Sequence, residues 1–281
     1  MKILAMGDFD GKLPKKYIDL VKKEKIDLVV CDGDYPPFSL RKEFFDYIFP
    51  SIFDIELWDV VGKKEYKEKT RADHIAGESV MKKLDKLSVP VLTVLGNHDY
   101  SIPDDVADFG KPEDAWKWDW NEKDFLVKAL KKYKNIRRID YKFAVFGDFV
   151  FIGARGHSFP GQVKSKAFRK HKKILDSLFK KFKGKKIIFV SHNSPYDTKL
   201  DKITSKEAHE IVKDKHYGSK LVRRVIDQHQ PILSISGHVD EGWGKQKLGK
   251  TLAVNCGAVH DGRVAVIEIS DKGKIDVRFI S

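Results

Sequence analysis

The sequence contains little cysteine and no long apolar segment. Only two of its 281 residues are cysteine, Cys31 and Cys256, and both lie in apolar runs. Two such thiols build no disulfide framework, which is typical of a reducing compartment. No run approaches the ~20 apolar residues that span a bilayer, and the first residues, MKILAMGDFDG, turn acidic too early for a signal peptide. We therefore expect a cytoplasmic protein without disulfides or membrane partners.

The chain also lacks internal repeats, low-complexity segments and linkers rich in Pro, Gly and Ser. This predicts a single domain that spans residues 1–281. Hydrophobic residues make up 41% of the chain, which is enough to build a core. Charged residues make up 34%, against roughly 25% in ordinary soluble proteins. This excess, carried by many Lys and Glu, is similar to the surfaces of proteins from thermophiles.

The net charge is +13, from 54 Lys and Arg against 41 Asp and Glu. A basic protein attracts phosphates, nucleic acids and anionic membranes. Here the lysines alternate with apolar positions, as in KKYIDLVKKEK, and form no arginine-rich block. We interpret most of them as solvated helix faces, so the charge identifies no partner by itself.

Short apolar runs alternate with amphipathic stretches over the first two thirds of the chain. Predicted strands include KILAMGD, IDLVVCDGD, VPVLTVLGNHD and KIIFVSHNSP, and the closely spaced KFAVFGD and FVFIGARG predict a hairpin. Residues 219–229 predict a helix that Ser219 caps. The alternation predicts an α/β fold with a mainly parallel sheet, and the strand-rich tail TLAVNCGA, VAVIEIS and KIDVRFI predicts a second, mixed sheet.

Two segments interrupt this alternation, and each follows a strand end. Residues 35–62 are rich in aromatic side chains, and residues 101–121 are acidic and include three tryptophans. Because α/β proteins place binding loops at strand ends, both segments are candidates for a cap over the site. The alternative is that they are helical insertions that pack aromatic side chains against the rim of the fold.

Polar side chains that can bind metal follow the ends of five predicted strands. In chain order they are Asp8 and Asp10 of GDFDG, Asp34 of DGDY, Asn97, His98 and Asp99 of GNHD, His192 of SHNSP, and His238 and Asp240 of GHVD. One such residue means little, because a lone buried histidine is usually a core residue. Since the carboxyl ends of parallel strands meet at one crevice, the whole series predicts a single polar site.

This series resembles the pattern of the calcineurin-like metallophosphoesterase superfamily, which runs D-x-H, GD, GNH(D/E), a histidine after a strand, and G-H-x-H. The similarity extends from Gly7 to Gly257, and its second half (SHNSPYDTKLDK, HYGSKLVRRVIDQHQP, GHVDEGWG and NCGA) resembles the Icc-like intracellular branch. The resemblance implies a four-layer α/β/β/α sandwich of two mixed sheets flanked by helices. It also implies hydrolysis of a phosphate monoester or diester by a two-metal mechanism with a metal-bound hydroxide as nucleophile.

Carried over position by position, the resemblance assigns site residues. Asp8, Asp10, Asp34 and Asp240 would surround a first metal ion, and Asp34 would bridge to a second ion held by Asn97, His192 and His238. His98 would act as general acid or would stabilise the charge of the transition state, with Asp99 orienting its ring. Arg155, His157 and His216 are weaker candidates for contact with the substrate phosphate.

The sequence departs from the family pattern at Asp10 and Asp240, where the family has histidine. Both changes fall on the first metal and both install an oxygen ligand, while the second set of ligands is intact. This favours a first site retuned for a hard ion, Mn²⁺ before Mg²⁺ or iron, and less suited to zinc. A weak or empty first site and a loss of catalysis are the alternatives.

The expected substrate is a small phosphate ester or a nucleotide. The basic charge keeps open a nuclease of the same superfamily, which would act on DNA or RNA. The two departures keep open a catalytically silent interaction scaffold of this fold. The sequence does not indicate the oligomeric state or the substrate.

Overall fold

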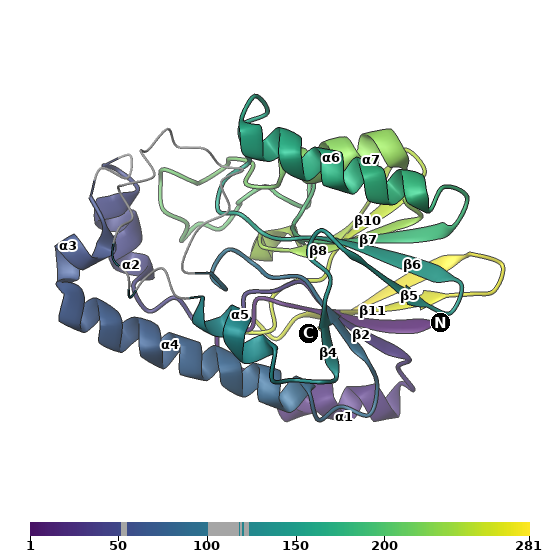
Figure 1. Ribbon diagram of the computed structural model, residues 1–281, viewed down its shortest axis with the longest axis horizontal. Coiled ribbons are helices and arrows are strands. Elements are labelled where there is room, and N and C mark those ends of the chain that lie inside the picture. Colours follow the sequence, from purple (N-terminus) through teal and green to yellow (C-terminus); the bar gives the residue numbers. More distant parts are fainter. Residues whose placement is uncertain (52–54, 101–117, 119, 121–123) are drawn as a thin grey trace.

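The computed structural model describes residues 1–51, 55–100, 118, 120 and 124–281. Two six-stranded sheets lie face to face, and helices cover the outer face of each (Figure 1). The four-layer α/β/β/α sandwich that the sequence predicts is therefore confirmed. None of the described helices is both long enough and apolar enough to cross a membrane.

The first sheet has the strand order β12-β11-β1-β2-β3-β4. Its parallel part consists of β1 (Lys2–Met6), β2 (Leu28–Cys31), β3 (Val91–Thr93) and β4 (Ile136–Arg138). The two C-terminal strands, β11 (Val264–Ile269) and β12 (Ile275–Ile280), extend this sheet on the other side of β1 in antiparallel pairing. The helices α1 (Lys15–Lys23), α4 (Lys63–Leu84) and α5 (Phe125–Leu130) lie on its outer side (Figure 1).

The second sheet has the strand order β5-β6-β7-β8-β10-β9. Its parallel part consists of β6 (Phe149–Ala154), β7 (Lys186–Asn193), β8 (Leu233–Gly237) and β10 (Thr251–Asn255). The antiparallel edge strands are β5 (Phe143–Phe146), which forms the predicted hairpin with β6, and β9 (Gly244–Leu248). Two helices, α6 (Lys166–Lys181) and α7 (Lys220–His229), cover this sheet (Figure 1).

The prediction that the whole tail joins the second sheet is wrong. Of the three tail strands only β10 belongs to it, whereas β11 and β12 belong to the first sheet. The reason is a long-range pairing, in which β11 lies beside β1 with Ala5 opposite Ala265. Pairing of this kind leaves no trace in the local periodicity of the tail.

The strands alternate between two cores, as a period of two requires. Ile3 and Ala5 of β1 face the core between the sheets, while Leu4 and Met6 face the core under the helices. With both faces buried, β1 reads as a continuous apolar run. This burial leaves only the strand ends available for polar chemistry.

The two interrupting segments differ in what can be described. Residues 35–62 include the short helix α2 (Arg41–Glu43), the π-helical turn η1 (Phe44–Ile48) and helix α3 (Leu57–Val61). Except for Trp118 and Trp120, residues 101–121 lie outside the described residues. Trp118 packs 5.6 Å from Trp58 of α3, measured between ring centroids. That these segments cap the site, and that residues 1–281 form one domain, stay predictions.

Candidate active site

Three of the candidate ligands follow strand ends in a strained backbone conformation. Asp8, Asp34 and His238 come directly after or close to the ends of β1, β2 and β8, with φ angles of 49°, 53° and 73°. Non-glycine residues adopt this left-handed region at a cost of about 1–3 kcal/mol each. The strain turns each side chain away from its own strand, toward the edge at which the strands of both sheets end.

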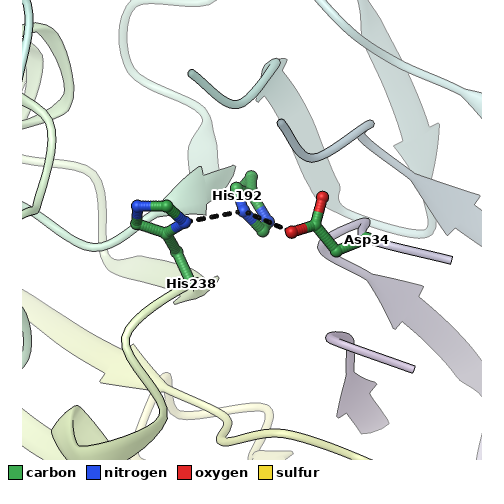
Figure 2. A group of neighbouring side chains, drawn as sticks. All are labelled: Asp34, His192 and His238. Atoms are coloured by element: carbon green, nitrogen blue, oxygen red, sulfur yellow. Dashed lines mark hydrogen bonds and ion pairs between the residues drawn. The ribbon is translucent and has the colours of Figure 1, made fainter. Parts of the chain in front are cut away.

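Asp34, His192 and His238 meet at this edge (Figure 2). The Nε2 atom of His192 lies 3.4 Å from Oδ2 of Asp34 and 3.0 Å from Nδ1 of His238. The side-chain oxygen of Asn97 lies 2.9 Å from the same Nε2 atom. The structure thus brings together the residues that the resemblance assigns to the second metal.

The hydrogen bonds around His192 fix which of its ring nitrogens carries a proton. Its Nδ1 lies 3.0 Å from the backbone carbonyl of Asp32, so Nδ1 must donate. In the neutral ring, Nε2 then carries a lone pair that points at the oxygens of Asn97 and Asp34. Burial lowers the pKa of His192 well below its ordinary value, so the ring is neutral. Oxygens that face this lone pair are repelled unless a cation lies between them, whereas Nδ1 of His238 can donate to Nε2 in one of its two tautomers.

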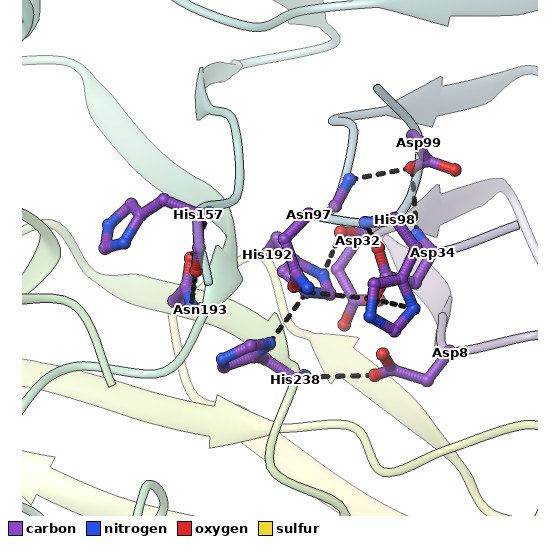
Figure 3. A network of polar contacts seen from close by, with 12 residues as sticks. Asp8, Asp32, Asp34, Asn97, His98, Asp99, His157, His192, Asn193 and His238 are labelled. Carbon is purple, nitrogen blue, oxygen red and sulfur yellow. Dashed lines mark hydrogen bonds and ion pairs between the residues drawn. The ribbon is translucent and has the colours of Figure 1, made fainter. Parts of the chain in front are cut away.

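Asp8 and Asp32 lie near Asp34 (Figure 3), and the charge of Asp240 also acts on Asp34. Burial raises the pKa of Asp8 well above its ordinary value, and the charges of Asp32, Asp240 and Asp34 raise it further. Burial also raises the pKa of Asp34 to about 7, although the backbone N–H of His98 donates a 2.8 Å hydrogen bond to its carboxylate. A divalent cation at this position would offset the repulsion, so the donor set fits a metal centre.

His98 and Asp99 complete the GNHD turn beside Asp34 (Figure 3). The Asp99 carboxylate accepts hydrogen bonds from the backbone N–H groups of Asp34, Tyr35 and Gly96, at 2.7–2.9 Å. The Nδ1 atom of His98 lies 3.5 Å from Oδ2 of Asp34, and no hydrogen bond between described residues links this ring to Asp99. Asp99 therefore holds the backbone that presents Asp34, and its expected role in orienting the ring stays a prediction.

The residues at the two departures lie apart from this group. The carboxylate of Asp240 belongs to a second group with His260 and Asp261. Asp10 belongs to neither group and lies close enough to His98 and Asp73 for its charge to act on both. Its assignment to the first metal stays a prediction.

The weaker substrate-binding candidates all have partners in the protein. The guanidinium of Arg155 lies over the ring of Tyr100, 3.4 Å from its centroid. The ring nitrogens of His157 contact the carbonyl of Phe159 and the hydroxyl of Ser219. These contacts give Arg155 and His157 roles in holding loops, and contact with substrate stays a prediction.

His216 is bound in the same way, because its Nδ1 atom lies 2.8 Å from the buried carboxylate of Asp201. The same carboxylate also accepts hydrogen bonds from the backbone N–H groups of Asp197, Thr198 and Gly218. His216 is thus part of a network that shapes its loop, and its contact with substrate also stays a prediction.

Three residues at the site were missed by reasoning from the sequence. Asp32 is fully buried, its Oδ1 has no hydrogen-bond partner among the described residues, and burial raises its pKa to about 8. His260 lies against Asp8 and Asp240. The charge of the exposed Arg41 acts on Asp34, His98 and His238. Only Asp32 had a sequence signal, as an acidic residue directly after the apolar run of β2.

The comparisons agree with this geometry. The chain matches the family model described as metallophosphoesterase, calcineurin superfamily, over residues 115–279, which is more than half of its length. The chain therefore belongs to the metallophosphoesterases of the calcineurin superfamily, hydrolases of phosphate esters that use divalent metal ions. The matched range includes His192 and His238, whereas Asp8, Asp34 and Asn97 precede it.

Solved structures share the fold over the whole chain. One that is 20% identical has a TM-score of 0.69 and covers 100% of this chain and 99% of its own. The protein TT1561 of Thermus thermophilus is 15% identical, with a TM-score of 0.59, and the match covers 99% of this chain and 97% of that one. At these identities the likeness shows the fold alone. The comparison with curated proteins gave no match.

Proposed function

We propose that this protein hydrolyses a phosphate ester at a centre of two divalent cations that share the carboxylate of Asp34. The observation that carries the proposal is the position of the side-chain oxygens of Asn97 and Asp34 against Nε2 of His192, whose proton is on Nδ1. Nδ1 of His238 lies 3.0 Å from the same Nε2 atom. Such an arrangement is unfavourable in a purely structural cluster and suits a metal site. Membership of the family supports the same conclusion.

The residues divide into two sets around Asp34. Asn97, His192 and His238 would hold one cation, and Asp8 and Asp240 would hold the other. Bound there, the pair supplies the positive charge that neutralises phosphoryl oxygens and makes a water molecule acidic enough to attack phosphorus. The set of Asn97, His192 and His238 offers two nitrogen ligands, and the set of Asp8 and Asp240 offers only oxygen ligands. We therefore propose Mn²⁺ as the preferred ion.

His98 would act on the leaving group. Burial lowers its pKa to about 4, so the ring is neutral near pH 7 and can donate one N–H without a positive charge of its own. Its backbone N–H bonds to Asp34, and its ring packs against Phe38 with 4.9 Å between centroids. These contacts hold the ring beside the metal ligands, where it would donate a hydrogen bond to the leaving oxygen.

Arg41 would bind the phosphate of the substrate. Its side chain is exposed and lies over the ring of Phe45, 5.9 Å from its centroid, and among the described residues it makes no ion pair or side-chain hydrogen bond. Its charge nevertheless lies close enough to act on Asp34 and His98. A guanidinium that is free to form two parallel hydrogen bonds matches a phosphoryl group at the mouth of the site. We propose a small phosphate ester or nucleotide as the substrate.

The test is hydrolysis of a chromogenic phosphomonoester and a chromogenic phosphodiester in the presence of Mn²⁺. We expect turnover that depends on the cation, and we expect Asp34→Ala to abolish it. His98→Ala should lower kcat by about 10²–10⁴-fold. The control His229→Ala removes a histidine that pairs with Asp176 between α7 and α6, away from the site, and should keep its activity. A folded protein that hydrolyses neither ester with Mn²⁺, Mg²⁺, Fe²⁺ or Zn²⁺ would contradict the proposal.

A further inference from the structure

His260 is held against the candidate metal centre by the backbone of Asp8. Its backbone N–H lies 3.2 Å from the carbonyl oxygen of Asp8, and its ring Nδ1 lies 2.8 Å from the same oxygen. The turn that carries it follows β10 and is itself attached to β1, through a bridge between Gly7 and Ala258. The position of the ring is therefore fixed by the same strand end that presents Asp8.

The contact with Asp8 determines what the other ring nitrogen offers. A carbonyl only accepts, so Nδ1 must donate, and in the neutral ring Nε2 carries a lone pair. A hydrogen bond from one ring nitrogen to a backbone carbonyl is also what orients metal-binding histidines in general. The ring can therefore bind a cation through Nε2 once that nitrogen has released its proton.

Nε2 of His260 faces two carboxylates at distances that suit a shared ion. It lies 3.5 Å from Oδ2 of Asp240 and 3.6 Å from Oδ1 of Asp261. These distances exceed the 2.7–3.2 Å of an N–H···O hydrogen bond. Ligand bonds of ~2.0–2.2 Å place neighbouring ligand atoms roughly 3–3.6 Å apart. The spacing fits ligands around one cation as well as an ion pair between His260 and these carboxylates.

Arg263 distinguishes the two carboxylates. Its Nη1 donates a 3.0 Å hydrogen bond to the backbone carbonyl of Asp240 and lies 3.5 Å from Oδ2 of Asp261. Asp261 thus already has a cationic partner, and its side chain is 40% exposed. The Asp240 carboxylate is 27% exposed, and its charge acts on Asp8 and Asp34. Asp240 is therefore the carboxylate that His260 shares with the centre.

We propose that His260 coordinates the first cation through Nε2, together with the carboxylate of Asp240, whose charge also acts on Asp8 and Asp34. This inference rests on the proposed two-cation centre and changes its composition. The first site then has a nitrogen ligand from outside the motifs, supplied by the loop after β10. A site of one nitrogen and several oxygens should accept Zn²⁺ or Fe²⁺ as well as Mn²⁺. The oxygen-only site expected from Asp10 and Asp240 would be incomplete.

The test measures cation binding to chelator-stripped protein by calorimetry with Mn²⁺. Two variants separate binding of the cation by Nε2 of His260 from the hydrogen bond that its Nδ1 donates to the Asp8 carbonyl. His260→Ala removes the whole ring, whereas His260→Asn keeps a short amide that can donate to the Asp8 carbonyl but lacks Nε2. His229→Ala is the matched control, because it breaks a histidine–carboxylate pair of 2.8 Å outside the site. Circular dichroism checks that each variant is folded.

We expect wild type and His229→Ala to bind two Mn²⁺ per chain. Both His260 variants should retain one cation and lose affinity for the other by more than about tenfold, since even contacts that only support a ligand cost on the order of 10–100-fold. Wild-type binding in His260→Asn would overturn the inference, whether or not His260→Ala binds, and would leave the two-cation centre intact. A wild-type protein that binds no cation and hydrolyses no ester would instead overturn the proposed function, and this inference with it.

Discussion

Replacing Asp34 by asparagine should stabilise the metal-free protein and abolish its activity. Asp34 is 6% exposed, and burial raises the pKa of its carboxyl group to about 7. Asparagine has nearly the same shape and keeps an oxygen for the backbone N–H of His98. Its amide nitrogen could donate to Nε2 of His192, which lies 3.4 Å from the present Oδ2. The substitution therefore removes a buried charge without creating a cavity.

The magnitude follows from the shift of the Asp34 pKa, from its ordinary 3.8 to about 7. Three units correspond to roughly 4 kcal/mol, and neighbouring carboxylates that take up protons reduce the expected gain to about 2–4 kcal/mol. The unfolded chain ionises above pH 3.8 and the folded protein only above about 7. The cost of the charge is thus absent below about pH 4, grows between pH 4 and 7, and is complete above 7.

The assay is thermal unfolding of chelator-treated wild type and Asp34→Asn. Near pH 8 the variant should melt about 5–15 °C higher, and near pH 4 the two should melt together. Excess Mn²⁺ should reverse the order, because only the wild type is stabilised by binding. Asp19→Asn, at an exposed position of α1, controls for the loss of one charge. A metal-free variant that is less stable than wild type near pH 8 would refute the reasoning.

Three further predictions concern His74, Arg41 and Gly7. Burial lowers the pKa of His74 to about 4, against the charge of Asp124. The contribution of the neutral ring to stability is therefore complete above pH 6.5 and is lost as the pH drops from 6.5 to 4. In urea unfolding, the free energy of unfolding of His74→Gln should fall by about 1–3 kcal/mol less than that of the wild type across this window. Arg41→Ala should lower kcat/KM about tenfold with an unchanged melting temperature, Arg41→Lys should recover part of it, and equal kinetics in all three proteins would argue against a phosphate contact. A Cβ on Gly7 would lie 1.3 Å from Oδ1 of Asp32, so Gly7→Ala should cost more than about 3 kcal/mol in denaturant unfolding, and a cost below about 1 kcal/mol would show that Asp32 can move aside.

Local patterns in the sequence predicted much of the fold. The burial of every residue of β2 matches the continuous apolar run that precedes Asp34. The hydroxyl of Ser219 accepts a hydrogen bond from the backbone N–H of Val222 and caps α7 as expected. The pairing of β11 with β1 was not predictable in this way, because it joins residues about 260 positions apart through backbone bonds that carry no sequence signature.

The site also contains residues that the sequence predicts and one that it does not. Asp34, His192 and His238 follow strands whose ends are visible in the sequence, and the structure brings them together. His260 follows the NCGA stretch but lies outside the family pattern. It is held beside Asp8 by the bridge between Gly7 and Ala258 and by its own hydrogen bonds to the Asp8 carbonyl. A residue that tertiary pairing brings to the site cannot be recognised from its spacing along the chain.

The most direct test of the central claim is electron paramagnetic resonance of the protein loaded with Mn²⁺. Two ions that share the Asp34 carboxylate would lie about 3.5–4 Å apart, close enough for their spins to couple. We predict two Mn²⁺ per chain and a coupled multiline spectrum that Asp34→Asn converts to the six-line signal of isolated ions. A six-line signal from the wild type, or a single bound ion, would contradict the account.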